Sequence, residues 1–526
     1  MKRALASLGD EDLDVLVVGG GIHGVWTARW AAACGLDTGL VEAVDYASGT
    51  SSRSTMLAHG GLRYLAQYDF GLVREALTER AHLVHKAPHL VRPLAFLLPF
   101  YEDSPFPDWQ LRIGVRLYSL LARGSGFPRH ELLTKRQVLE REPGLREEGL
   151  TGGALYWDAQ ILAPERLTTL VAREADDRGA HLANHARARD LLGEHRIEGV
   201  LVEDTLTGDE LHVEADTVVN ATGPFLDRFL DEAGPEDGMV RLTKGVHLAT
   251  PPFTDHAVVV NATDGRTFFA VPWHGHQWVG TTDTDYTDDP REVHATREDV
   301  SYLQDSLRRY FPDAPVDRVR FTNAGLRNLL NVEGVPPSDV SRGAEIHDHV
   351  DEGRPGMVSL VGGKLTTARA TARELFEAAA RYLDDVPQPC DTDRRLPGGD
   401  VDPPRAYRQA RRVLDERGLS AATARRLVRL YGSEWAHVAG AGLDGLGAEG
   451  SILAGEAERA VALESARTVA DVLRRRTLAW AGPDRGRDAA EHVAAILESE
   501  GVDRDQAQAS IGDYEDELAL HERWQD

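Results

Sequence analysis

The amino-acid sequence predicts an α/β protein in which a domain with a parallel sheet is interrupted by an antiparallel sheet and followed by a helical domain. Three observations predict this arrangement: a strand, glycine-rich loop, helix and strand in residues 14–42, strand-like alternation in residues 240–283, and a mostly helical pattern from about residue 404 onward. The chain has 526 residues, which is the length of several domains rather than of one small module.

The first of these segments has the order of elements that defines a dinucleotide-binding unit. Residues 14–18 read as a buried strand, residues 25–34 as an Ala-rich helix, and residues 38–41 as a second apolar strand that ends at Glu42. The loop between the first strand and the helix contains Gly19, Gly21 and Gly24. The acidic residue follows the last glycine by 18 positions, close to the spacing of about 20 in Rossmann-type units.

Each residue of this unit has its own expected role in binding a nucleotide. Gly19 makes the tight turn, Gly21 lets the backbone approach a pyrophosphate, and Gly24 lets the helix pack closely on the strand. The N-terminus of the helix then holds the anion. Glu42 accepts hydrogen bonds from a ribose diol and repels a 2′-phosphate, so we expect an adenine dinucleotide without that phosphate.

A long separation along the chain indicates that this domain is discontinuous. The next comparable strand, residues 216–220, begins about 170 residues after the second one, which is too far for a single crossover. Residues 257–260, 267–273 and 278–282 alternate as strands of an antiparallel sheet, and residues 357–361 return to a buried strand. We expect residues 1–85, 150–235 and 345–385 to form the nucleotide-binding domain, residues 86–149 and 236–344 a substrate domain, and residues 386–526 a helical domain.

Composition and charge argue against several classes of protein. The formal net charge is −26, so a nucleic-acid-binding surface would act against the field of the whole protein, and we expect no nucleic-acid partner. Cys34 and Cys390, the two cysteines of the chain, provide neither a disulfide framework nor a thiolate metal cage, and we expect no metal site. Residues 1–14 lack the apolar core of a secretion signal, and no stretch is long and apolar enough to span a membrane. We therefore expect a protein of the reducing cytoplasm.

A further set of motifs resembles one family of flavoproteins. Residues 48–64 read Ser-Gly-Thr-Ser-Ser-Arg-Ser-Thr-Met-Leu-Ala-His-Gly-Gly-Leu-Arg-Tyr. This segment resembles the flavoprotein glycerol-3-phosphate dehydrogenases, in which it reads S-S-x-S-(S/T)-K-L-I-H-G-G-(L/V)-R-Y-L. Similar motifs follow in the same order at residues 220–224, 243–247, 280–283, 325–327, 362–367, 396–399 and 471–477. They extend over nearly the whole chain, which makes a chance similarity improbable.

The resemblance implies a fold like that of D-amino-acid oxidase, with a Rossmann-like FAD-binding domain, and it implies FAD as the cofactor. The implied reaction is the oxidation of sn-glycerol 3-phosphate to dihydroxyacetone phosphate in glycerol catabolism, with the electrons passed to a membrane quinone. The residues expected to bind FAD are Gly19, Gly21, Gly24, Glu42, Thr50, Ser51, Ser52, Ser54, Thr55, Gly223, Gly363, Lys364, Leu365 and Thr366.

Two positions near the expected flavin are informative. Lys364 follows two glycines at a turn that reads as the start of a helix. A cation and a helix N-terminus would both favour the negative charge that builds up on a reduced isoalloxazine ring. Met56 stands where the family usually has Lys, which removes one cation and leaves Ser52, Ser54 and Thr55 as hydrogen-bond donors.

The resemblance also implies a substrate site with a base and an anion-binding group. His59 is the expected base, because the ordinary histidine pKa of about 6.5 suits proton removal near neutrality; the alternative is a structural histidine packed under the flavin. Arg327 and Arg342, 15 residues apart on what reads as a loop, are similar to the family's substrate arginines and are expected to bind phosphate oxygens. An alternative role for Arg327 is to lie beside the reacting hydroxyl and lower its pKa. The remaining expected substrate contacts are Arg63, Tyr64 and Thr281.

The segment of residues 109–123 is expected to form a basic, amphipathic helix. At about 100° per residue, Arg112, Arg116 and Arg123 fall within about 40° of one another, and the rest of the helix is largely apolar. This pattern suits a membrane interface; the alternative is a core helix with one solvated edge. Known relatives are peripheral membrane enzymes that reduce quinone, so the resemblance favours attachment to the cytoplasmic face of the membrane. Association as a homodimer is a further expectation.

Three other functions remain open from the sequence. The first is a glycerol-3-phosphate oxidase, which would pass its electrons to oxygen and form peroxide. The second is a related 2-hydroxy-acid or amine flavoenzyme, which would bind a carboxylate and need no phosphate-binding group. The third is an inactive flavin-binding or regulatory subunit.

Overall fold

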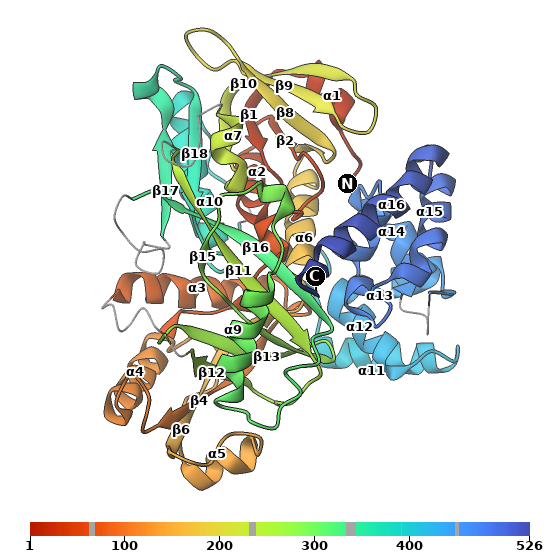
Figure 1. The fold of residues 1–526 in the computed structure, drawn as a ribbon. Helices are drawn as coiled ribbons and strands as arrows, with labels where there is room; N and C mark the ends of the chain where they lie inside the picture. Colours follow the sequence, from red (N-terminus) through yellow and green to blue (C-terminus); the bar gives the residue numbers. More distant parts are fainter. Residues whose placement is uncertain are drawn as a thin grey trace.

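The structure, a computed structural model, describes residues 1–62, 69–230, 238–262, 264–332, 343–390, 392–447 and 452–525. Two sheets and a group of C-terminal helices make up the fold (Figure 1). The first sheet lies at the top of Figure 1, the second sheet below it, and the C-terminal helices lie beside both sheets at the right.

The first sheet consists mainly of short parallel strands buried on both faces. In spatial order its strands are β17 (Ala344–Asp348), β18 (Met357–Gly362), β10 (Glu210–Asn220), β1 (Leu13–Val18), β2 (Thr38–Val41) and β7 (His181–Ala183), and β17 alone among these runs antiparallel to its neighbour. Val15 and Val17 enter one hydrophobic core, whereas Leu16 and Val18 enter another. A strand buried on both faces needs apolar residues on both sides, which explains the apolar run from Val15 to Val18 in β1.

Helices and a smaller ladder flank this sheet. The helix α2 (Ile22–Ala33) packs against α6 (Pro164–Asp176) and α10 (Ala368–Ala379). The strands β8 (Ala186–Leu192) and β9 (Gly199–Asp204) extend β10 as an antiparallel ladder. The helices α1 (Leu5–Asp10) and α7 (Leu226–Phe229) complete this part of the molecule. The loops that follow β1, β2, β10 and β18 all lie at the carboxyl edge of the parallel strands, where ligands bind in open α/β sheets.

The second sheet is mainly antiparallel. Its strands are β3 (Leu57–Ala58), β4 (Val91–Tyr101), β5 (Glu131–Thr134), β6 (Leu150–Ile161), β11 (Val240–Thr250), β12 (Ala257–Asn261), β13 (Thr267–Trp273), β14 (His276–Gly280), β15 (Thr284–Asp285) and β16 (Phe321–Leu330). The pair β4 and β12 is parallel, and the other pairs formed by the described residues are antiparallel. The strands β3 and β6 join this sheet although the sequence analysis assigned their residues to the nucleotide-binding domain, because β6 pairs with β4 along almost its whole length.

Several helices border the second sheet. They are α3 (Phe70–Lys86), α4 (Asp108–Leu121), α5 (Lys135–Arg141) and α9 (Arg297–Arg308). The predicted amphipathic helix corresponds to α4, which buries Val115 and Tyr118. Among the described residues, no helix combines the length and the apolarity that crossing a membrane requires.

The C-terminal part is helical and docks on the first sheet through buried ion pairs. Its helices are α11 (Pro403–Asp415), α12 (Ala421–Tyr431), α13 (Trp435–Ala441), α14 (Ala454–Glu464), α15 (Ala490–Ser499) and α16 (Arg504–Leu520), with a short hairpin of β19 (Gly445–Leu446) and β20 (Ile452–Leu453). Arg475 and Arg476 both contact the carboxylate of Asp45, at 3.0 Å and 2.6 Å. All three side chains are buried, so this contact ties the C-terminal helices to the loop after β2.

Candidate active site

A cavity of about 1590 Å³ lies where the two sheets meet. Its walls come from the loops after β1, β2, β10 and β18, from β11 and β16 of the second sheet, and from α4 and α16. The lining includes these predicted site residues: Gly19, Gly21, Glu42, Thr50, Ser51, Ser54, Thr55, His59, Gly223, Thr281, Arg327, Gly363, Lys364, Leu365 and Thr366. The structure therefore brings together residues that the sequence placed in separate motifs.

The glycine loop after β1 needs glycine for two different reasons. Gly19 has a φ of +110°, and a Cβ atom there would lie 2.5 Å from the carbonyl oxygen of Ala221. A Cβ atom on Gly24 would lie 1.9 Å from the carbonyl oxygen of Gly19. Gly24 itself does not line the cavity; it lets α2 start directly against the turn, with Gly21 at the N-cap of the helix.

Glu42 lies at the carboxyl end of β2 and is held by backbone donors. Its carboxylate accepts hydrogen bonds from the N–H of Gly20 at 2.7 Å and from the N–H of Val44 at 2.9 Å. Burial raises the pKa of this carboxyl group above its ordinary value, and the two N–H donors oppose that shift. The side chain thus joins the glycine loop to the second strand and faces the cavity.

The hydroxyl-rich segment after β2 is hydrogen-bonded to its surroundings. Thr50 donates to the carbonyl oxygen of Leu326 on β16 at 2.7 Å, and Ser51 accepts from the N–H of Ile22 at the start of α2 at 2.9 Å. Ser52 is buried, donates to the carbonyl oxygen of Gly49 at 3.2 Å and does not line the cavity. Ser51 and Thr50 therefore connect the glycine loop to the second sheet.

The same segment continues toward a buried histidine. Ser54 accepts a hydrogen bond from the N–H of Met56 at 3.1 Å, and the Thr55 hydroxyl lies 2.9 Å from Nε2 of His247. The ring of His247 stacks on Trp278, with 5.3 Å between centroids. Burial, together with the nearby positive charge of Arg327, lowers the pKa of His247 to about 3. At neutral pH this imidazole is uncharged and serves as a hydrogen-bonding group.

The turn after β18 differs from the sequence prediction. Gly362 and Gly363 both adopt positive φ, and Lys364 to Thr367 form a turn, so that α10 begins only at Ala368. The expectation that Lys364 starts a helix is therefore wrong, because the chain needs one further turn before it reaches the helix axis. Lys364 still lines the cavity.

His59 follows β3 and is held at its backbone. Its N–H donates to the hydroxyl of Thr366 at 3.2 Å, and its half-buried ring packs edge-on against Phe269 on β13, with 5.9 Å between centroids. The next residue, Gly60, donates its N–H to the hydroxyl of Tyr118 on α4 at 2.8 Å. The imidazole thus lines the cavity from a loop that is fixed on both sides.

Arg327 lies on β16 and not on the predicted loop, because residues 321–330 pair with β11 along their whole length. Its guanidinium group donates to Asp283 at 3.0 Å, to the hydroxyl of Thr281 at 3.1 Å and to the carbonyl oxygen of Thr282 at 3.1 Å. Asp283 is only 8% exposed, whereas Arg327 is 21% exposed. The ion pair thus fixes the orientation of a cation that faces the cavity.

Three predicted substrate residues, Arg63, Tyr64 and Arg342, lie outside the described residues. Conversely, the structure adds His247, Asp283 and Arg53 to the site. The first two belong to motifs that the sequence analysis matched to the family without giving them a role. Arg53 lines the cavity beside the C-terminal helices, and burial lowers the pKa of its guanidinium group to about 10.

Comparison with known proteins agrees with this geometry. A protein family described as "FAD dependent oxidoreductase" matches residues 14–378, and one described as "C-terminal domain of alpha-glycerophosphate oxidase" matches residues 390–508. An aerobic glycerol-3-phosphate dehydrogenase from Staphylococcus haemolyticus is 36% identical over 81% of this chain and 79% of its own length. The chain belongs to the FAD-dependent glycerol-3-phosphate dehydrogenase family.

Two further relatives place the chain within the FAD-dependent glycerol-3-phosphate dehydrogenase family. The X-ray structure of the glycerol-3-phosphate dehydrogenase from Bacillus halodurans complexed with FAD superposes with a TM-score of 0.78, at 30% identity, covering 99% of this chain and 97% of that one. An alpha-glycerophosphate oxidase from Streptococcus pyogenes is 42% identical over 65% of this chain and 58% of its own length. The predicted fold class and FAD as the cofactor are confirmed.

The residues of the cavity fit FAD. The glycine loop leaves backbone and no side chain at the start of α2, where N–H groups suit a pyrophosphate. Nε2 of His23 is buried at the cavity wall and has no hydrogen-bond partner among the described residues. A Cβ atom on Gly363 would lie 2.6 Å from that nitrogen, so the two loops meet there without a side chain between them.

Proposed function

We propose that this protein oxidises sn-glycerol 3-phosphate to dihydroxyacetone phosphate in glycerol catabolism and passes the electrons to a membrane quinone. The observation that carries this proposal is that His59, Thr281 and Arg327 line the same cavity as the glycine loop. Arg327 is held there by Asp283 and by the hydroxyl of Thr281. The relatives named as glycerol-3-phosphate dehydrogenases support the choice of substrate.

Each residue of the proposed site has a separate role in this reaction. Arg327 binds phosphate oxygens, or lies beside the reacting hydroxyl and lowers its pKa, while Thr281 forms a hydrogen bond with the substrate. His59 takes the hydroxyl proton as the carbon-bound hydrogen leaves as hydride. FAD, when bound, supplies the acceptor of that hydride, and Lys364 favours the negative charge that results. Arg63, Tyr64 and Arg342 complete the proposed substrate site.

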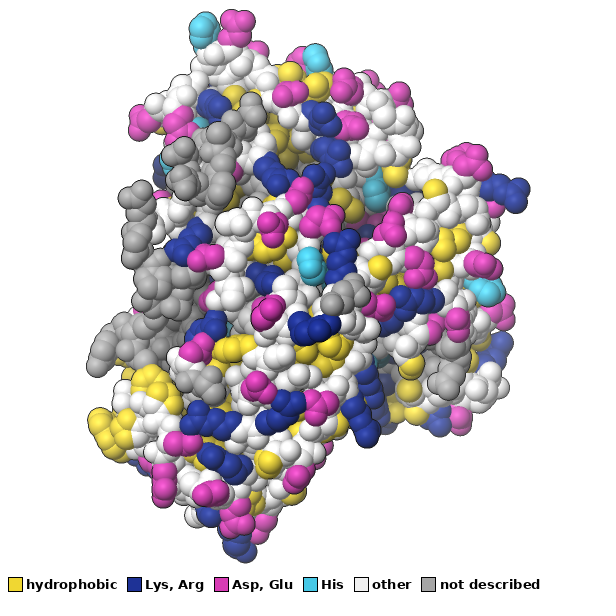
Figure 2. Space-filling view, in the orientation of Figure 1, with side chains coloured by type: hydrophobic (Ala, Val, Ile, Leu, Met, Phe, Trp, Pro, Cys, Tyr) yellow, Lys and Arg dark blue, Asp and Glu magenta, His cyan; other side chains and the backbone are white. Residues whose placement is uncertain are grey.

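The proposed route of the electrons runs past α4. Trp109, Ile113 and Leu120 lie on one side of this helix and are 64%, 53% and 53% exposed, whereas Val115 and Tyr118 are buried on the opposite side. Figure 2 shows hydrophobic side chains gathered over α4 at the lower left. An apolar helix face in water is unfavourable unless something covers it, and the bilayer interface is the occupant that we propose.

The charges beside α4, and its position next to the cavity, also support membrane docking through this helix. Arg116 and Arg123 are exposed beside the apolar face of α4 and can meet anionic lipid headgroups. Trp109 and Ile113, together with Phe70 and Phe106, also line the mouth of the cavity. An apolar quinone could thus pass from the bilayer to the cavity without crossing water. We therefore propose peripheral attachment to the cytoplasmic face of the membrane.

A buried hydrogen-bond chain links α4 to the proposed base. Tyr118 on α4 accepts from the N–H of Gly60 and donates to Asp158 on β6 at 2.7 Å. Asp158 also pairs with Arg80 on α3 at 2.5 Å. These side chains are buried. A shift of α4 on docking to a surface would therefore move the loop that carries His59.

The experiment that tests this proposal uses the purified, flavin-loaded protein under anaerobic conditions. Addition of glycerol 3-phosphate should bleach the flavin absorbance, and a water-soluble quinone should restore it faster than oxygen does. Vesicles with anionic lipids should bind the protein, and Trp109→Ser combined with Ile113→Ser should weaken that binding. A flavin that stays oxidised with glycerol 3-phosphate would reject the reaction.

Oxygen is the second candidate for the electron acceptor, because the 42% identical relative from Streptococcus pyogenes is named an oxidase. In that case the reduced flavin should reoxidise rapidly in air and release one peroxide per substrate. If the substrate is instead a 2-hydroxy acid or an amine, a compound of that class without a phosphate group should bleach the flavin.

Gel filtration against size standards tests the proposed homodimer.

A further inference from the structure

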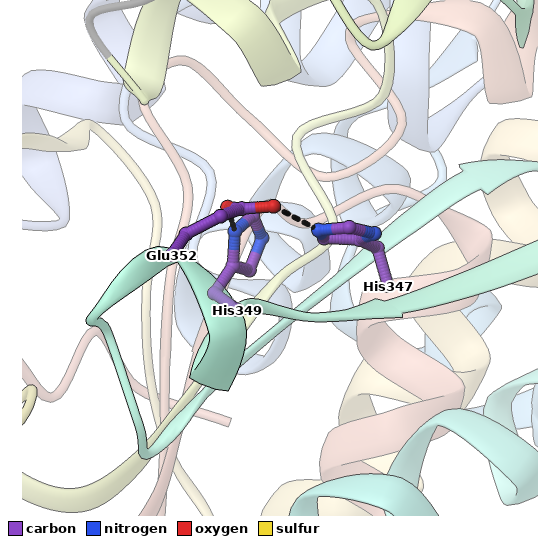
Figure 3. Close-up of side chains that lie close together, drawn as sticks. All are labelled: His347, His349 and Glu352. Atoms are coloured by element: carbon purple, nitrogen blue, oxygen red, sulfur yellow. Dashed lines mark hydrogen bonds and ion pairs between the residues drawn. The ribbon is translucent and has the colours of Figure 1, made fainter.

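The β17–β18 hairpin carries a group of side chains that the cavity does not use. The turn between its strands contains the short helix η5 (His349–Glu352). His347 lies opposite Ser359 in the register of the two strands. His347 lies near the end of β17 and His349 begins η5, and Glu352, at the end of η5, contacts both rings (Figure 3).

Three potential metal ligands converge at this turn. Nδ1 of His349 lies 2.5 Å from Oε2 of Glu352, and Nε2 of His347 contacts Oε1 of the same carboxylate. The ligand atoms of the three residues all lie within 4.8 Å of one another. The two rings are 4.6 Å apart and inclined at 75°, so their nitrogen atoms point toward the carboxylate and the rings do not stack face to face (Figure 3).

The surroundings hold the central histidine in place. The side chain of His349 is fully buried, and its other ring nitrogen, Nε2, lies 2.7 Å from the hydroxyl of Ser359. Such a contact on the far nitrogen is what orients a histidine that binds metal through its near nitrogen. Asp348 accepts a hydrogen bond from the N–H of Val350, and Gly353 ends the turn in the left-handed conformation. The turn is thus held by contacts within it and by Ser359 and Tyr382, which bond to His349 and Asp348 from outside it.

We propose that His347, His349 and Glu352 bind one divalent transition-metal ion, with zinc as the best match. Two imidazoles and a carboxylate suit zinc, whereas magnesium and calcium prefer sites made of oxygen ligands alone. Zinc bonds of about 2.0–2.2 Å separate tetrahedral ligands by about 3.4 Å, so the carboxylate would move outward by about 1 Å. Glu352 is 41% exposed at the end of the turn, which leaves it free to make this movement. A fourth position remains for water.

The role of such an ion would be structural. The hairpin continues through β18 into Gly362, Gly363 and Lys364 at the cavity wall. An ion bound to β17 and η5 would close the far end of the hairpin and so stabilise the strand that positions this wall. The ion would raise thermal stability and leave the chemistry of the cavity unchanged.

Metal binding to the full-length, flavin-loaded protein without a histidine tag tests the proposal. After incubation with zinc and removal of unbound metal, we expect about one zinc per chain by elemental analysis. Cobalt should give the visible absorption bands of a four-coordinate ion. Magnesium should neither bind stoichiometrically nor change the midpoint of thermal unfolding. Zinc should raise the midpoint of thermal unfolding by about 2 °C or more, because a ligand that binds only the folded state stabilises it.

Variants assign the binding to these side chains. His347→Ala and Glu352→Gln change partly exposed residues and should each remove stoichiometric zinc and the thermal shift, while flavin content stays normal. Ser359→Ala leaves all three ligands and should weaken zinc binding by about tenfold or more. His195→Ala removes an exposed histidine from the β8–β9 connection and should change nothing. No stoichiometric zinc in the parent protein, or zinc that persists in both His347→Ala and Glu352→Gln, would overturn the proposal.

Discussion

The two ends of the cavity are built in different ways. The nucleotide end comes from one strand, loop, helix and strand unit, in which Gly19, Gly24 and Glu42 act through backbone geometry and backbone hydrogen bonds. The proposed reacting end comes from separate strands, since His59 follows β3, Thr281 follows β14 and Arg327 lies on β16. A contiguous segment can be recognised from its own pattern, whereas an assembled pocket depends on strand pairing across the chain.

The two ends also differ in charge. Glu42 is a half-buried carboxylate that backbone N–H groups stabilise, and Arg327 is a cation paired with the nearly buried Asp283. Removing a partner from a buried ion pair costs far more than removing one from an exposed pair. Because the two ends face different parts of the bound molecules, we expect variants at the proposed reacting end to change turnover and variants at the nucleotide end to change FAD retention.

Arg327→Ala should have the largest effect. The variant removes the cation that faces the cavity and leaves Asp283 without this partner, and we expect kcat/KM for glycerol 3-phosphate to fall about 1000-fold, or about 4 kcal/mol. Arg241→Ala is the matched control, because Arg241 pairs with Asp285 at 2.6 Å on the same sheet but both side chains are more exposed. Steady-state kinetics measure both variants. Equal activity of Arg327→Ala and the parent protein would remove Arg327 from the site.

His59→Gln should have the next largest effect, on the rate of flavin reduction. An imidazole accepts a proton only in its neutral form, so the parent rate should rise with pH while the rate of the variant stays flat. The loss should be largest above about pH 7 and reach about 100-fold. Anaerobic stopped-flow absorbance measures this rate. A constant loss at every pH would favour the alternative, a histidine that only packs against the flavin.

Gly24→Ala should act at the other end of the cavity. Its Cβ atom would meet the Gly19 carbonyl oxygen, and overpacking of about 1–3 kcal/mol should weaken FAD retention roughly 10- to 100-fold. The flavin-loaded fraction should turn over normally. Gly512→Ala is the control, because no atom lies within 4 Å of a Cβ added at that position in α16. Flavin content after dialysis measures the effect, and full retention in Gly24→Ala would contradict the close contact.

His23→Asn should change the pH dependence of stability and have the smallest effect on turnover. Burial lowers the pKa of His23 to about 4, below the ordinary value of about 6.5. Between these pH values the unfolded chain binds a proton that the folded protein does not, so the free energy of unfolding falls as the pH falls, by up to about 1.4 kcal/mol per pH unit. His23→Asn removes this contribution and should flatten the acid side of the curve. Thermal unfolding from about pH 4.5 to 8 measures it, with the exposed His195→Asn as control; parallel curves for His23→Asn and the parent protein would contradict the assignment.

The sequence predicted one end of the cavity better than the other. The loop, helix and second strand of residues 19–42 follow local rules of turn geometry and periodicity. The expected helix start at Lys364 was wrong by four residues, because the path from β18 to α10 depends on where the helix packs against α2. The expected loop at Arg327 was wrong because pairing with β11 makes it a strand.

Some features had a weak sequence signal. The His-Asp-His spacing at residues 347–349, followed by Glu352, is a pattern that could have indicated a metal site, but the sequence analysis expected none. A spacing alone does not show whether side chains converge; the β17–β18 register and the η5 turn do that. The exposed apolar face of α4 is a similar case, since periodicity predicts an amphipathic helix but not which side of it the rest of the molecule covers.

The sequence by itself determined the fold class, the FAD-binding unit and the family, because these depend on residues close together in the chain and on the order of motifs along it. The tertiary structure alone decided that Arg327 pairs with Asp283, that the backbone N–H groups of His59 and Gly60 bond to Thr366 and Tyr118, and that His347, His349 and Glu352 converge. The physical reason is that each of these arrangements depends on strand register, turns and packing, which bring together side chains that no local pattern relates.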